Sequence, residues 1–365
     1  MSKEKLSHQD IISVIDALFH RIEVIELESC GRFPLYRFAD QTWKLSTGGS
    51  WMGGFWAGAL HLKAFKTRNR VDRDHAIKMS KKLESKLNSD TLQRSFIFHY
   101  GAGLSNWLSG DPMAKQMCYL AGHAIAKSEQ AELGFIPLGS AMGGGTSGSQ
   151  IFNIDPLAST LSLLSVAGYH ELAGRQMSKA VSACYEQTGC WYSEASYQSG
   201  QFIHHGVPGD WARGQAWAML ALMRAVHLFG DGYWSFAWQT VERWCAEYSY
   251  HIPINRLSQP EGVRDPCASL IACIAMLGLA RLMPDAAWLE SHALQQLATV
   301  VRSGYLDEGQ FALFGSGALF KEGKFIGHCY QTSEKEESCV ESPCGIFYLL
   351  AALMAADRQI EPLWL

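Results

Sequence analysis

Apolar residues recur at helical spacing along almost the whole of this 365-residue chain, and the helical segments alternate between two kinds. Segments of the first kind, such as residues 265–282, are apolar nearly all round, so they have to be buried. Segments of the second kind, such as residues 72–88, are amphipathic and can face solvent on one side. The spacing predicts twelve helices, at residues 7–25, 54–66, 72–88, 97–108, 112–128, 155–168, 170–187, 210–229, 233–248, 265–282, 285–303 and 342–357.

This alternation predicts the fold class. Six buried helices that alternate with six half-exposed ones indicate an inner ring of helices inside an outer ring. We therefore predict an all-α (α/α)6 barrel, formed by residues 1–365 as a single domain. An α-solenoid also alternates helices, but its repeats would be more even in length. The loops before the inner helices are long and rich in Gly and aromatic residues, with the longest around residues 188–209 and 304–341. Such loops are typical of the end of a barrel where a site is built.

Composition and charge exclude several classes of partner. Acidic and basic residues are interspersed, the formal net charge is −4 and no basic stripe is present, so we expect no nucleic-acid partner. No stretch has the length and apolarity of a membrane span, and residues 1–21 suit an amphipathic helix rather than a signal peptide, so we expect no membrane partner. The ten Cys lack the spacing of a metal site or a disulfide framework. We therefore expect reduced thiols, a cytoplasmic protein, no metal and no other cofactor.

Polar and aromatic residues gather where the predicted loops meet the inner helices, at intervals of about 50 to 60 residues with a longer last step. In a six-fold toroid these junctions converge on one end of the barrel and would form a pocket with apolar walls and few polar groups. The junction residues are Trp51, Trp56, His99, Tyr100, Asp155, His204, His205, Arg213, Trp217, Asp265 and Glu341. We expect one cavity to be lined by Trp51, His99, Asp155, His205, Arg213 and Trp217.

Four motifs resemble those of the unsaturated glucuronyl hydrolases and the related unsaturated rhamnogalacturonyl hydrolases, in the family's order from about residue 45 to 355. D-W-A-R-G-Q-A-W at residues 210–217 resembles the signature of the glucuronyl enzymes and is the most specific of the four. W-M-G-G-F-W-A-G at residues 51–58 is similar to W-x-x-G-F-W-x-G, and R-D-P-C-A-S-L-I-A-C at residues 264–273 is similar to D-x-S-A-S-A-I-A-A. I-D-P-L at residues 154–157 is similar to the V-D-x-L that opens the helix bearing the catalytic aspartate.

This resemblance implies a chemistry and a set of roles. The family removes a 4,5-unsaturated uronic acid from the non-reducing end of oligosaccharides left by polysaccharide lyases. It hydrates the C4=C5 vinyl ether, and the resulting hemiketal opens and releases the sugar. By this resemblance Asp155 is the acid/base, Arg213 helps to bind the oligosaccharide and Trp217 stacks on a sugar. Asp155 also suits a helix N-cap, since Pro156 follows it, and Asn153 competes for the catalytic position.

Two places depart from the family's pattern. His204-His205-Gly206 stands where the family usually has His-Gln-Gly, so His205 would replace a Gln that contacts the substrate and the catalytic water, with His204 beside it. His99-Tyr100 stands where the family has His-Asp, and a phenol with an ordinary pKa of about 10 cannot supply the charge of a carboxylate at neutral pH. We expect His99 and Tyr100 to contact the substrate. Tyr100 would change the substrate, change the reaction or abolish activity.

Three functions stay open on the sequence. The motifs favour an unsaturated-uronate hydrolase with altered specificity. A sugar epimerase or isomerase on the same toroid is the second, because His204 and His205 could supply its bases. A non-catalytic carbohydrate-binding relative is the third, suggested by Tyr100. Loss of the enol absorbance of an unsaturated substrate would indicate the hydrolase. Interconversion of free sugars would indicate the epimerase or isomerase, and binding without turnover the non-catalytic relative.

Overall fold

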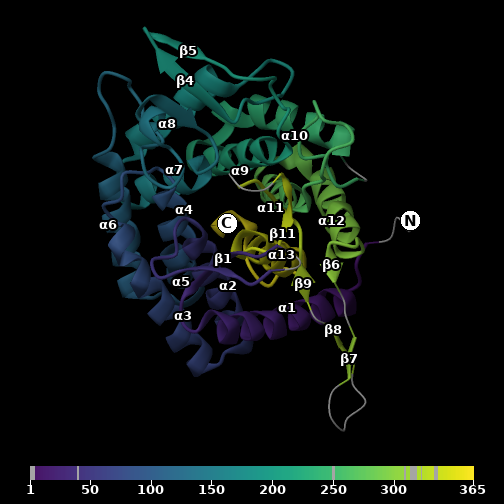
Figure 1. The fold of residues 1–365 in the computed structure, drawn as a ribbon. Coiled ribbons are helices and arrows are strands. Elements are labelled where there is room, and N and C mark those ends of the chain that lie inside the picture. The colour runs from purple at the N-terminus through teal and green to yellow at the C-terminus, as the bar shows by residue number, and fades with distance from the viewer. Residues whose placement is uncertain are drawn as a thin grey trace.

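Helices dominate the structure and form two concentric rings (Figure 1). The computed structural model describes residues 5–38, 41–248, 251–307, 310–312, 319–321, 323–332 and 336–365. Its α-helices are α1 (His8–Ser29), α2 (Met52–Thr67), α3 (Arg70–Lys82), α4 (Arg94–Phe98), α5 (Leu104–Ser109), α6 (Pro112–Ala126), α7 (Leu157–Val166), α8 (His170–Cys184), α9 (Ala212–Phe229), α10 (Trp234–Tyr248), α11 (Pro266–Leu282), α12 (Trp288–Val301) and α13 (Pro343–Ala356). Its strands are β1 (Phe33–Tyr36), β2 (Lys44–Ser46), β3 (Ile151–Asn153), β4 (Glu194–Gln198), β5 (Gln201–Ile203), β6 (Leu306–Asp307), β7 (Gln310–Ala312), β8 (Leu319–Lys321), β9 (Lys324–Phe325), β10 (His328–Tyr330) and β11 (Ser338–Val340).

Six helical segments form the inner ring: α2, the run from α4 to α5, α7, α9, α11 and α13 (Figure 1). Each packs against the next, and α13 packs against α2, so the ring is closed. Residues 52–64, 212–226, 266–279 and 343–355 are buried without exception, as expected of helices that are apolar all round. The run from α4 to α5 is continuous through a π-helical turn, His99–Gly103, which matches the predicted helix over residues 97–108.

The outer ring consists of α1, α3, α6, α8, α10 and α12 (Figure 1). These helices bury one stripe each. In α3 the buried residues are Ala76 and Met79, and in α10 they include Ala237, Val241 and Trp244 at helical spacing. Helix α1 packs against α13, so the two ends of the helical path meet. The alternation of buried and striped helices in the sequence therefore corresponds to the inner and outer rings.

The two ends of the barrel differ in the length of their connections. The turns that follow inner helices are short, such as residues 68–69, 110–111 and 167–169. The connections from outer to inner helices are long and hold every strand that the structure describes, in antiparallel pairs and one three-stranded sheet, β3-β4-β5. The longest strand in the described part of the chain, β4, has five residues, which is too short to leave a clear alternating pattern in the sequence. All these connections lead to the N-terminal ends of inner helices, so they share one face of the barrel.

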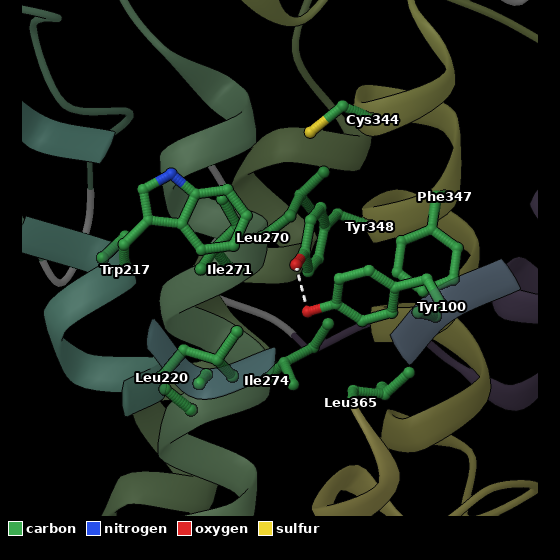
Figure 2. Packing of buried hydrophobic residues seen from close by; sticks show 14 of the residues in the cluster. Tyr100, Trp217, Leu220, Leu270, Ile271, Ile274, Cys344, Phe347, Tyr348 and Leu365 are labelled. Carbon is green, nitrogen blue, oxygen red and sulfur yellow. Dashed lines mark hydrogen bonds between the residues drawn. The ribbon is translucent and has the colours of Figure 1, made fainter. Parts of the chain in front are cut away.

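Side chains fill the axis of the barrel beneath this face (Figure 2). Phe55 of α2 stacks on Tyr100 with ring centroids 4.9 Å apart, and Trp217 of α9 meets Tyr348 of α13 at 5.4 Å. Leu365 is buried at the axis and lies below Tyr100 in the view of Figure 2.

Candidate active site

The N-terminal ends of the inner helices bring the predicted site residues to this face. Trp51 directly precedes α2, Asp155 lies two residues before α7, and Arg213 is the second residue of α9. Asp265 is the N-cap of α11, where its carboxylate accepts a hydrogen bond from the backbone N–H of Ala268 at 3.2 Å. Because inner helices all start at the same end, residues that are about 50 positions apart in sequence become neighbours.

The side chain of Arg213 is held in place by three contacts. Its guanidinium forms a buried ion pair with Asp265 and donates a second hydrogen bond to the carbonyl oxygen of Cys329 at 3.0 Å. It also lies over the ring of Trp211, 4.9 Å from the ring centroid. Burial by itself would lower the pKa of Arg213, but the carboxylate of Asp265 more than offsets this and raises it. Arg213 therefore carries a permanent positive charge at the face of the barrel.

Asp155 carries a carboxyl group that is partly shielded from solvent. It is half-buried, and its Oδ1 is shielded from solvent and has no hydrogen-bond partner in the described part of the chain. Burial raises the pKa of Asp155 to about 7; the charge of Arg213 opposes this rise and that of Glu194 adds to it. A carboxyl group with a pKa near 7 can both give and take a proton at neutral pH.

The hypothesis that Asp155 caps α7 is not realised in the structure. Helix α7 begins at Leu157 without a side-chain cap, and the backbone N–H of Asp155 instead donates to Oδ1 of Asn153 at 3.0 Å. Asn153 is buried and stabilises the turn before the helix. Of these two competing residues, Asp155 is the one with a carboxyl oxygen available for chemistry.

Two tryptophans belong to the same aromatic cluster near the axis. The ring of Trp51 lies 6.2 Å from that of Phe96, and the ring of Phe96 lies 5.0 Å from that of Trp217. Trp217 follows Arg213 by one helical turn on α9, as predicted from their spacing. Trp51 also meets His328 edge-on, with ring centroids 6.3 Å apart.

His99 and Tyr100 lie deeper in the barrel than the residues described so far. Figure 2 shows Tyr100 beside Phe347 and Tyr348, further from the start of α13 than Cys344. The two phenol oxygens of Tyr100 and Tyr348 are 2.7 Å apart, and burial raises the pKa of Tyr100 to about 12. His99 is fully buried, with Nε2 at 3.4 Å from the backbone oxygen of Leu365. Burial and the nearby Arg224 hold the pKa of His99 well below its ordinary value, so both residues are neutral at pH 7.

The histidine pair lies away from this cluster. His204 and His205 follow β5 and are exposed. Nε2 of His204 donates to the carbonyl oxygen of Ala183, in the outer helix α8, at 2.6 Å, and its ring stacks on Tyr192 at 4.1 Å. These contacts turn His204 toward α8 and not toward the aromatic cluster. The physical reason is the β4-β5 hairpin, which leads the chain outward and back over α8 (Figure 1).

Sequence reasoning missed two polar residues near the cluster. His328 of β10 is buried, with Nδ1 2.7 Å from the hydroxyl of Ser342 and Nε2 without a partner in the described residues. Glu194 of β4 lies opposite Asn153 in the β3-β4 ladder. Neither belongs to a motif. Glu194 comes near the site because β4 pairs with the distant strand β3, and His328 lies on β10, which pairs with β11 just before α13. Glu341, in contrast, was among the junction residues, and it is buried between Arg21 and Arg37 at 2.7 Å from each.

The described residues offer no group of three or more His, Cys, Asp or Glu that could hold a metal ion. All ten cysteines are free thiols. None of the helices that the structure describes is long and apolar enough to cross a membrane. A hollow of about 390 Å³ lies beside the cluster, lined by Tyr36, Phe38, Trp43, Lys44 and residues near them. Tyr36 connects it to the site through Tyr330, at a ring distance of 5.0 Å.

Comparison with known proteins establishes the fold. No protein-family model and no curated protein sequence matches the chain. Among solved structures, it is similar to the unsaturated glucuronyl hydrolase of Bacillus sp. GL1, with 20% identity, a TM-score of 0.83 and coverage of 97% of this chain and 98% of that one. It is also similar to an unsaturated glucuronyl hydrolase specific for heparin (17% identity, TM-score 0.79, coverage 97% and 98%). A third is the unsaturated glucuronyl hydrolase of Streptococcus agalactiae (16% identity, TM-score 0.83, coverage 99% and 95%). The chain has the helical toroid fold of these enzymes, and the predicted (α/α)6 barrel is confirmed.

Proposed function

We propose that this protein is a hydrolase that removes a 4,5-unsaturated uronic acid from oligosaccharides by hydrating the C4=C5 double bond. The observation that carries the proposal is the carboxyl group of Asp155. It lies at the mouth of the barrel, it has an unpartnered oxygen, its pKa is raised to about 7, and it is close enough to Arg213 to feel its charge. The fold supports the proposal, since one of the similar structures, a mutant of the unsaturated glucuronyl hydrolase from Streptococcus agalactiae, is complexed with dGlcA-GalNAc6S.

Asp155, Arg213 and the two tryptophans have different roles in this reaction. Protonated Asp155 gives its proton to C4, which leaves positive charge at C5. The resulting carboxylate then takes a proton from water as the water oxygen bonds to C5, and this restores the acid. The hemiketal so formed opens and the remaining sugar leaves. Arg213 contributes a permanent positive charge for the uronate carboxylate, and Trp51 and Trp217 offer ring faces to sugar C–H groups.

The substrate we propose differs from that of the family's ordinary members. At position 100 a neutral phenol, bonded to Tyr348, stands where the resemblance places a carboxylate. The hollow beside Tyr36 and Tyr330 is lined by aromatic and polar side chains, which suit the saccharide on the leaving side. We also propose a cytoplasmic location, since ten free thiols persist best in a reducing compartment.

The test follows the loss of the conjugated enol absorbance for a panel of unsaturated disaccharides. Wild type should turn over at least one of them. Asp155→Asn, which keeps the shape but cannot transfer a proton, should lower kcat by about 10²–10⁴-fold with little change in substrate binding. Equal rates for wild type and Asp155→Asn would refute the catalytic assignment. If wild type binds but does not turn over the whole panel, or interconverts free sugars, the binding or epimerase function replaces hydrolysis.

A further inference from the structure

Strand pairing places a second carboxyl group next to Asp155. In the β3-β4 ladder Asn153 lies directly opposite Glu194, so their side chains are on the same face of the sheet. The neighbouring pair, Phe152 and Ala195, is buried and faces the core on the other side. Glu194 itself is half-buried.

One amide group connects the two acids. Nδ2 of Asn153 donates to Oε2 of Glu194 at 3.5 Å, while Oδ1 of the same side chain accepts from the backbone N–H of Asp155 at 3.0 Å. Asn153 is buried, and both contacts are partly buried, so the position of its side chain is restricted. A change in charge at Glu194 is therefore felt at Asp155.

The charged groups around Asp155 determine how the charge of Glu194 affects it. The positive charge of Arg213 is shared with Asp265 in a buried ion pair, so it only partly opposes the rise in the pKa of Asp155. The third group near Asp155 is the thiol of Cys184 in α8, whose pKa is raised by burial, so it is uncharged at neutral pH. With Asp155 and Glu194 both ionised, the described site would hold a pair of like charges, and such a pair favours protonation of one member. Asp155 is the member with an oxygen that is shielded from solvent and has no hydrogen-bond partner among the described residues.

We propose that Glu194 is a positioning residue of the active site, the second carboxylate that, through Asn153, keeps a proton on Asp155 at neutral pH. This rests on the proposed function of Asp155 as the acid that protonates C4. It also gives the site a second carboxylate that does not depend on position 100, where Tyr100 is neutral and bonded to Tyr348.

The experiment measures kcat against pH for wild type and Glu194→Gln. Gln keeps the size of the side chain and an oxygen that can accept from Asn153, and it removes the charge. Loss of the like charge should move the alkaline limb of the profile toward acid by about one pH unit, because a nearby like charge disfavours the ionised form of a carboxyl group. At pH 8 this corresponds to a loss of about tenfold in kcat. Glu194→Asp, which keeps the charge, should restore most of the wild-type profile.

Glu186→Gln is the matched control, because Glu186 is an exposed acid in the same connection between α8 and α9. Its profile should coincide with that of wild type. A direct titration of the Asp155 carboxyl by ¹³C NMR, in wild type and Glu194→Gln, is the second readout and needs no turnover. An unshifted titration and an unshifted limb in Glu194→Gln would overturn the proposal. If no disaccharide is turned over but the titration of Asp155 moves to lower pH, the coupling stands and the hydration reaction is the part that fails.

Discussion

Removing the hydrogen bond between Tyr100 and Tyr348 by mutation would test whether Tyr100 stabilises the core or takes part in the reaction. Both hydroxyl groups are fully buried, their oxygens are 2.7 Å apart, and aromatic rings surround them. Replacing Tyr100 by Phe leaves the hydroxyl of Tyr348 without this partner, and replacing Tyr348 by Phe leaves the hydroxyl of Tyr100 with Ser159 only, in a site that water does not reach. Such a loss costs about 1–3 kcal/mol, whereas replacing both partners by apolar groups of the same shape is nearly neutral.

We therefore expect Tyr100→Phe and Tyr348→Phe each to lower the free energy of unfolding by about 1–2 kcal/mol. The double variant should lose less than the sum of the two, with a coupling energy of about 1–2 kcal/mol. Urea denaturation at pH 7, followed by tryptophan fluorescence and circular dichroism, measures all four corners of the cycle. Additivity within about 0.5 kcal/mol would refute the reasoning, because it would mean that the two hydroxyls do not depend on each other.

The same variants separate structure from chemistry. If Tyr100 is a core residue, Tyr100→Phe keeps kcat within a few-fold on any disaccharide that wild type turns over. A fall of about 10²-fold or more would instead place the phenol in the reaction. Tyr100→Asp should be less stable than Tyr100→Phe, because it removes the stack on Phe55 and puts a carboxyl group among the rings of Phe55 and Phe347.

Three further predictions concern the site itself. The raised pKa of Asp155 means that between about pH 4 and pH 7 the folded state holds a proton that the unfolded state has lost, so wild type loses stability as pH rises through this range. Asp155→Asn does not titrate, so in the same denaturation assay it should be more stable than wild type at pH 8, by about 1–4 kcal/mol, and equal to it near pH 4. Arg213→Met leaves Asp265 buried without its partner and should cost about 3–5 kcal/mol of unfolding free energy, while a cost under 1 kcal/mol would show that the ion pair is not formed in solution. His204→Ala and His205→Ala should change kcat less than about twofold, because both side chains are exposed and His204 is hydrogen-bonded to the outer helix α8, and a loss like that of Asp155→Asn would assign them a role in the reaction.

The helices and their layers could be predicted from the sequence because burial on all sides and burial on one side leave different patterns of apolar residues. Residues 265–282 and 72–88 show the two patterns, and they became inner helix α11 and outer helix α3. The same logic located Asp155 and Arg213, since the start of an inner helix must lie at one end of a closed ring. These are local properties of a segment, and neighbours in sequence determine them.

The surroundings of individual side chains depend on contacts between segments that are distant in sequence. Glu194 reaches Asp155 only because β4 pairs with β3 in one register, and a strand of three residues, β3, carries too little pattern to reveal its partner. His204 looked like a site residue beside its motif, yet the β4-β5 hairpin directs it to α8. Tyr100 was recognised as a departure from a pattern, but its partner Tyr348 lies on a helix 248 positions away. A helix is specified by contacts within a few residues of each other, whereas the surroundings of a side chain depend on which distant segments close the ring around it, and that information exists only in the folded chain.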